Sequence, residues 1–283
     1  MELSAVLFDM DGVLIDTDQA IADLWNALAA QSGLTITAAD FAAHIYGCSP
    51  EHTVETVFAS LAPHDRVQVL RRVREAEPGL AFSPVPYAAD LVRQLAAAGM
   101  PLALVTGASA DRAGHALHTL GLTGLFTTAV TWGESARGKP APDCYLLAAD
   151  RLGVTPQTCL VFEDTTAGVS AAVAAEAACV AVSRLDPQPL RTAGARHVVP
   201  DFAAVGLRRD KTLTLLDIAD QETFKLRPAV RRCPAPSATG EQSQAGYASD
   251  THQPDLRPSP APLRAHHDRR APQLGEAGGE RAG

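Results

Sequence analysis

The chain has 283 residues, of which 46% are apolar and 20% charged, a composition typical of globular proteins. Its formal net charge of −8 argues against a nucleic-acid partner or an anionic membrane surface, which usually select basic proteins. Its five cysteines form no C-x-x-C pair, and no apolar run reaches the roughly 18–20 residues that span a bilayer, so we expect a cytoplasmic protein with reduced thiols.

The first predicted element is a short buried strand at residues 4–8, an apolar run that ends at Asp9. The residues up to this point lack the basic start and the small-residue cleavage site of a signal peptide. Apolar side chains at helical spacing then predict helices at 18–30, 51–62 and 64–76. Because no strand pattern occurs between about 16 and 84, these helices are predicted to form an insertion after the first strand.

From residue 87 onward, helical and strand patterns alternate. Helices are predicted at 87–98, 111–120, 142–152 and 167–176, and strands at 101–105, 127–131, 159–162, 179–182 and 197–199. Apolar strands joined by amphipathic helices indicate right-handed crossovers and a parallel sheet covered on both faces. The sequence therefore predicts an α/β fold, a doubly wound, Rossmann-like parallel sheet with an inserted α-helical domain.

These patterns also predict the domain boundaries. Residues 1–15 and 85–206 form the α/β core, and residues 16–84 form the helical insertion. Residues 207–227 are a C-terminal extension to which no structure is assigned. Residues 228–283 contain eight prolines and few large apolar side chains, so they cannot bury enough surface to offset their chain entropy and are predicted to be disordered.

Residues able to do chemistry follow the predicted strands at one edge of the sheet, where open parallel sheets bind ligands. In strand order they are Asp9 and Asp11, Thr106 and Gly107, Lys139 in the loop after 127–131, and Glu163 and Asp164. Each could have a local role instead, since Asp and Gly favour turns and a loop lysine is often solvated. Asp143 could either pin Lys139 or stabilise a helix start.

The combination of these side chains indicates phosphoryl transfer. Four carboxylates at one edge repel each other, and a hard cation such as Mg²⁺ resolves this repulsion. A hydroxyl, backbone amides and an ammonium suit a bound phosphate, whose charge a metal and a lysine neutralise. A carboxylate can attack phosphorus to form an aspartyl-phosphate, and a second carboxylate two residues on can protonate the leaving oxygen and later activate water.

Four segments in this order, VLFDMDGVLIDT, LVTGAS, GKPAPDCY and VFEDTTAGVSAA, resemble the motifs of the haloacid dehalogenase superfamily in its phosphatase branch. The resemblance covers about residues 3–205, and the insertion lies where that family has a helical cap. It implies a phosphoric monoester hydrolase with a nucleophilic Asp9 and Asp11 as general acid and base. It further implies Mg²⁺ held by Asp9, the Asp11 backbone carbonyl and Asp164, with Glu163 close by, and phosphate held by Thr106, Gly107 and Lys139.

The function expected from this resemblance is a phosphatase for a small phosphorylated metabolite such as a sugar or polyol phosphate. The alternative is a phosphomutase similar to β-phosphoglucomutase, in which a histidine after the first motif and a cap lysine help to prevent hydrolysis. Here residues 16–21 contain no histidine and residues 16–84 no lysine, which favours water as the acceptor. A dehalogenase is less favoured, because it needs neither the second aspartate nor the metal cluster, and a catalytically silent binding protein stays an alternative.

Substrate selection is expected in the cap, with Gly47 and Ser49 as candidate substrate-binding residues. The same loop contains Tyr46 and Cys48, and His44 and His52 lie next to it as further candidates. A histidine on a helical face is more often structural or solvated, so a purely structural role stays open for these residues. We expect a monomer or a small homo-oligomer.

Overall fold

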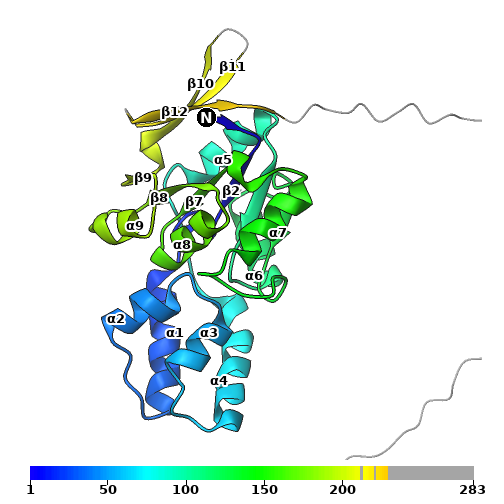
Figure 1. Ribbon diagram of the computed structural model, residues 1–283. Helices are drawn as coiled ribbons and strands as arrows, with labels where there is room; N and C mark the ends of the chain where they lie inside the picture. Colours follow the sequence, from blue (N-terminus) through cyan, green and yellow to red (C-terminus); the bar gives the residue numbers. More distant parts are fainter. Residues whose placement is uncertain (211–212, 220, 229–283) are drawn as a thin grey trace, which may run out of the picture. The chain divides into compact units, whose positions relative to one another are not determined.

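The apolar run before Asp9 forms β2 (Ala5–Phe8), which lies inside a six-stranded parallel sheet of order β6-β5-β2-β7-β8-β9 in the computed structural model (Figure 1). The other strands are β5 (Leu102–Val105), β6 (Thr128–Val130), β7 (Cys159–Glu163), β8 (Ala178–Val182) and β9 (His197–Val199). The structure describes residues 1–210, 213–219 and 221–228. The tail predicted to be disordered lies, after Pro228, outside the described residues.

Successive residues of β2 point to opposite faces of the sheet, and a separate set of helices covers each face. Val6 and Phe8 pack with α5 (Ala88–Ala97) and α6 (Ala110–Thr119). Ala5 and Leu7 pack with helices of the other face, namely α7 (Asp143–Leu152), α8 (Thr166–Ala174) and α9 (Gln188–Thr192). This two-sided burial is the reason that the strands read as continuous apolar runs.

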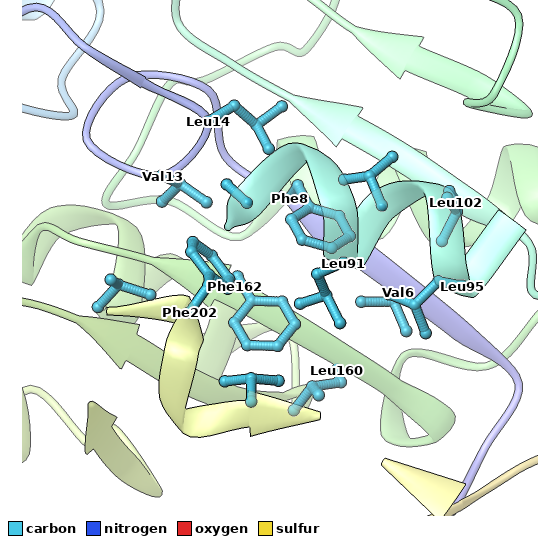
Figure 2. Close-up of a cluster of buried hydrophobic side chains, with 14 of the residues drawn as sticks. Val6, Phe8, Val13, Leu14, Leu91, Leu95, Leu102, Leu160, Phe162 and Phe202 are labelled. Carbon is cyan, nitrogen blue, oxygen red and sulfur yellow. The ribbon is translucent and has the colours of Figure 1, made fainter. Parts of the chain in front are cut away.

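Aromatic side chains form the centre of the first face. Phe8 stacks on Phe162 with ring centroids 5.1 Å apart, and Phe202 packs against Phe162 at 5.3 Å (Figure 2). All three are at most 1% exposed. Because Phe8 and Phe162 directly precede Asp9 and Glu163, this packing fixes the strand ends that carry the two acids.

The insertion is helical, as predicted. It contains α1 (Asp18–Gln31), α2 (Ala38–Asp40), the short η1 (Phe41–Ile45), α3 (Pro50–Thr56), α4 (Pro63–Ala76) and η2 (Glu77–Gly79). Its own core includes Trp25 and Phe58, whose ring centroids are 5.8 Å apart. The predicted helix at 51–62 is shorter in the structure, because Phe58 turns into this core before Pro63 begins α4.

Two short antiparallel strands, β3 (Ile15–Asp16) and β4 (Ser83–Pro84), join the insertion to the sheet domain. The two places where the chain passes between the sheet domain and the insertion therefore lie side by side. We refer to the helical insertion between them as the cap.

The segment 205–226, for which the sequence yielded no assignment beyond residue 206, forms three strands: β10 (Val205–Asp210), β11 (Leu213–Ile218) and β12 (Glu222–Leu226). They form a second sheet in which β12 pairs in parallel with the N-terminal β1 (Glu2–Leu3), in the order β1-β12-β11-β10. Buried Leu216 and Phe224 join the first core. Among the described helices, none is long and apolar enough to cross a membrane.

Candidate active site

After β2 the chain adds β5 and β6 on one side of it and then β7, β8 and β9 on the other. The carboxyl ends of β5, β2 and β7 therefore border a crevice at a topological switch point of the sheet. Asp9 follows β2 there, 3% exposed, and its N–H donates to the Phe162 carbonyl at 3.0 Å. Gly12 then takes a positive φ of 74°. A Cβ at Gly12 would collide with the Asp164 carboxylate, so only glycine permits the first loop to lie against the fourth motif.

Lys139 places its ammonium between two carboxylates. Its Nζ lies 2.6 Å from Asp9 Oδ1 and 2.6 Å from Glu163 Oε1, and it donates to the Val105 carbonyl at 3.2 Å. The lysine is 5% exposed. Burial alone would lower the pKa of Lys139, but the two carboxylates raise it above its ordinary value, so the side chain is a permanent buried cation.

Glu163 is 0% exposed, and donors from the protein surround it. Tyr145 Oη donates to Oε1 at 2.6 Å, while Oε2 accepts from the N–H of Asp164 at 3.1 Å and from Thr165 Oγ1 at 3.2 Å. Gly168 on α8 faces this carboxylate so closely that a Cβ would overlap it. Glu163 is therefore held by several donors, and its Oε1 contacts both Tyr145 and Lys139 at 2.6 Å.

The acidic cluster of Asp9, Glu163 and Asp164 has the chemistry of a divalent-cation site, with one carboxylate oxygen of each within 4.8 Å of the others. Burial and neighbouring acids raise the pKa of Asp164 well above its ordinary value. Burial, against the pull of Lys139, raises the pKa of Asp9 to about 7. Asp164 Oδ1 is buried without a hydrogen-bond partner in the described part of the chain. Oxygen ligands, like-charge repulsion and an unpartnered buried acceptor fit a hard cation such as Mg²⁺.

Thr106 and Gly107 lie at the end of β5, beside Asp9. Thr106 is 6% exposed, and its hydroxyl accepts from the N–H of Ala108 at 3.0 Å, which shapes the turn into α6. Thr106, Gly107 and Lys139 line one cavity, and Gly107 lines a second with Asp9. Gly107 thus borders both the cavity of Thr106 and Lys139 and the cavity of the predicted nucleophile.

The cap loop meets the core at three glycines. A Cβ on Gly47 would overlap the Thr165 side chain, one on Gly138 would approach Ser49 Cβ to 2.8 Å, and one on Gly107 would lie 3.5 Å from the Cys48 carbonyl oxygen. Gly47 and Ser49 therefore lie against the core motifs and line its cavities. Ser49 also caps α3 by accepting from the N–H of His52 at 3.3 Å.

Asp11 belongs to a network that the sequence did not reveal. Thr17 Oγ1 donates to Asp11 Oδ1 at 2.6 Å, and the buried Arg112 of α6 pairs with both Asp11 oxygens. Arg112 also contacts Glu77, the buried first residue of η2 in the cap. Asp9, Asp11, Glu77 and Arg112 line one cavity together.

The predicted residues Asp9, Asp11, Thr106, Gly107, Lys139, Glu163 and Asp164 thus surround one strand edge, with Gly47 and Ser49 facing it from the cap. Asp143 does not pin Lys139; it begins α7 and pairs with Arg137 at 2.8 Å. His44 and His52 contact each other at 3.3 Å, and His52 borders the Lys139 cavity. Arg112, Glu77 and Tyr145 were not found from sequence, although Tyr145 stands inside the third motif and could have been noticed there.

Comparison with known proteins agrees with this arrangement. The sequence profile of the haloacid dehalogenase-like hydrolases matches residues 3–176. Hexitol phosphatase A of Escherichia coli is 34% identical over 187 residues, which cover 65% of this chain and 84% of that protein. The fructose-1-phosphate phosphatase of the same organism is 33% identical over 181 residues, covering 61% and 92%. A crystal structure of β-phosphoglucomutase from Clostridium difficile shares the fold, with a TM-score of 0.59, 23% identity and coverage of 70% and 91%.

Proposed function

The chain belongs to the haloacid dehalogenase-like hydrolase family as an enzyme of its phosphatase branch, and we propose that it is a Mg²⁺-dependent phosphatase that acts on a small sugar or polyol phosphate through an aspartyl-phosphate. One observation carries the proposal. Buried Lys139 lies 2.6 Å from Asp9 in a cluster that also holds Glu163 and Asp164, and this grouping supports Asp9 as the nucleophile beside a buried cation and a possible metal site.

The proposed metal ligands are Asp9, the Asp11 backbone carbonyl and Asp164, with Glu163 beside them. When bound, Mg²⁺ would supply positive charge against the phosphoryl oxygens and relieve the repulsion among these carboxylates. The raised pKa values of Asp9 and Asp164 and the unpartnered Asp164 oxygen support this assignment. Glu163 is held by Tyr145 and Lys139 and, in this proposal, orients the lysine rather than the metal.

In the first half-reaction, an Asp9 carboxylate oxygen forms a bond to phosphorus while the bond from phosphorus to the leaving oxygen breaks. Asp11 in its protonated form gives its proton to that oxygen, so an alcohol departs. Lys139 and the hydroxyl of Thr106, with the amide of Gly107, hold the phosphoryl oxygens. In the second half-reaction, Asp11 takes a proton from water as the water oxygen bonds to phosphorus and Asp9 is released.

The substrate class is proposed from two lines of support. The relatives named above are a hexitol phosphatase, 34% identical over 187 residues, and a fructose-1-phosphate phosphatase, 33% identical over 181 residues. The cap supplies no lysine, and the first cap helix begins without the histidine expected of a mutase, so water is the proposed acceptor. A cavity lined by Asp9, Asp11, Gly47 and the cap residue Trp25 offers space for the leaving group.

The test is release of phosphate from p-nitrophenyl phosphate with Mg²⁺ and with chelator, followed by a panel of hexitol and sugar phosphates. Asp9→Asn should abolish Mg²⁺-dependent release, whereas Asp150→Asn, the same change at an exposed site on α7, should leave it intact. Equal activity of the wild type and Asp9→Asn would refute the mechanism. Efficient conversion of β-glucose 1-phosphate to glucose 6-phosphate with a bisphosphate activator would instead show a mutase.

A further inference from the structure

Both carboxylate oxygens of Asp11 are occupied by donors. Arg112 donates through Nη1 to Oδ2 at 3.2 Å and through Nη2 to Oδ1, which also accepts from Thr17 Oγ1 at 2.6 Å. These three side-chain contacts, two from Arg112 and one from Thr17, fix the orientation of the Asp11 carboxyl group.

Arg112 is itself held in place from two directions. Its side chain is 4% exposed, and Nη1 also contacts Glu77 Oε1 of the cap at 3.4 Å. Glu77 in turn accepts from the N–H of Ser109 at 3.0 Å and from Ser109 Oγ at 2.5 Å, at the start of the helix that carries Arg112. A planar guanidinium fixed in this way presents two N–H donors to the Asp11 carboxyl group in a defined orientation.

We propose that Arg112 is a positioning residue that holds the Asp11 carboxylate as the base of the second half-reaction. The inference rests on the proposed function. In that step the Asp11 carboxylate removes a proton from water, the water oxygen bonds to phosphorus, and the bond from phosphorus to the Asp9 oxygen breaks. The products are inorganic phosphate, a free Asp9 carboxylate and a protonated Asp11. Arg112 touches neither phosphorus nor water in this scheme and acts through Asp11.

Asp11 acts as an acid in the first half-reaction and as a base in the second. Measuring the two half-reactions separately therefore distinguishes a positioning role of Arg112 from a purely structural one. The first needs a proton from Asp11 when the leaving group is an alcohol, but p-nitrophenolate leaves without protonation. With p-nitrophenyl phosphate, the loss of Arg112 should therefore spare formation of the aspartyl-phosphate and slow its hydrolysis. A fold-level defect at Arg112 would slow both half-reactions.

The experiment is rapid mixing of the Mg²⁺-loaded enzyme with p-nitrophenyl phosphate for the wild type, Arg112→Lys, Arg112→Gln and Asp11→Asn. Arg93→Gln is the matched control, because Arg93 pairs with Asp90 on the surface of α5. For both Arg112 variants we expect a stoichiometric burst of p-nitrophenolate, the sign of an accumulating covalent intermediate. The following steady state should be about tenfold to a hundredfold slower than in the wild type, the cost of a misplaced catalytic group. KM should fall with kcat, so that kcat/KM stays within about twofold.

Arg112→Lys keeps a cation opposite buried Glu77, so it carries the test if Arg112→Gln does not fold, as judged by thermal unfolding. A missing burst, with kcat and kcat/KM falling together in folded Arg112→Lys, would overturn the proposal and make Arg112 structural. A rise in kcat would also overturn it, because Arg112 would then restrain Asp11 away from the water. Failure of the proposed function itself is recognised separately, since the wild type would show no Mg²⁺-dependent turnover.

Discussion

Replacing Lys139 by methionine removes the ammonium that lies 2.6 Å from both Asp9 and Glu163. The two acids are 3% and 0% exposed, so neither can recover its hydration when the cation is lost. Breaking a buried ion pair by removing one partner costs about 3–5 kcal/mol. We expect the free energy of unfolding of Lys139→Met to fall by about that amount at pH 8 in the presence of chelator.

The pH dependence of this loss follows from the pKa of Asp9, which burial raises to about 7 from an ordinary value of 3.8. A carboxyl group with a raised pKa in the folded state binds its proton more tightly there than in the unfolded chain, so stability falls as pH rises from about 4 to 7. Without Lys139 the ionised acid is still less favourable. The deficit of Lys139→Met should therefore be larger at pH 8 than at pH 5.

The assay is urea unfolding followed by circular dichroism at both pH values, with Lys225→Met as the control at an exposed lysine. The control should change stability by less than about 0.5 kcal/mol. A double variant, Lys139→Met with Glu163→Gln, also removes one of the two buried acids left without a cation. It should regain part of the free energy of unfolding that Lys139→Met loses. A deficit below about 1 kcal/mol, or one equal at pH 5 and pH 8, would refute the idea that two buried carboxylates depend on this cation.

Three further changes test other parts of the site. Mg²⁺ should raise the melting temperature more at pH 8 than at pH 5, because protons compete for carboxyls whose pKa values are raised, and Asp164→Asn should abolish the gain in a thermal-shift assay. Gly168→Ala should lower both melting temperature and kcat, because its Cβ would overlap Glu163, whereas Gly114→Ala on α6, with open space around it, should be neutral or stabilising. Tyr145→Phe removes the 2.6 Å hydrogen bond to Glu163 and should cost about 1–3 kcal/mol in denaturant unfolding; an unchanged midpoint would mean that the bond contributes nothing.

The sequence predicted the sheet and the residues at its edge because both depend on short-range patterns. Apolar runs buried on two faces mark the strands, and a residue that follows a parallel strand must lie at the carboxyl edge wherever the strand is placed. Asp9, Thr106 and Asp164 could therefore be located without knowledge of any contact.

The contacts made by side chains over long sequence distances could not be predicted in this way. Arg112 reaches Asp11 across 101 positions, and Glu77 reaches Arg112 from the cap across 35. No periodicity links these residues, since their pairing depends on how η2 and α6 pack. The strands at 205–226 were not predicted, because β12 pairs with β1 at the opposite end of the described chain and a local sequence pattern cannot indicate that pairing.

The charges of the site lead us to expect that the proposed metal and the phosphate group bind together. The carboxylates at the strand edge are Asp9, Asp11, Glu163 and Asp164, and within the part of the chain that the structure describes they pair with two buried cations, Lys139 and Arg112. Arg112 is also shared with Glu77, so negative charge remains in excess around the cavity. A phosphate monoester brings further negative charge into surroundings where burial strengthens repulsion. The described residues alone therefore repel a phosphate monoester, and under the proposed mechanism a divalent cation bound by these acids would offset that repulsion.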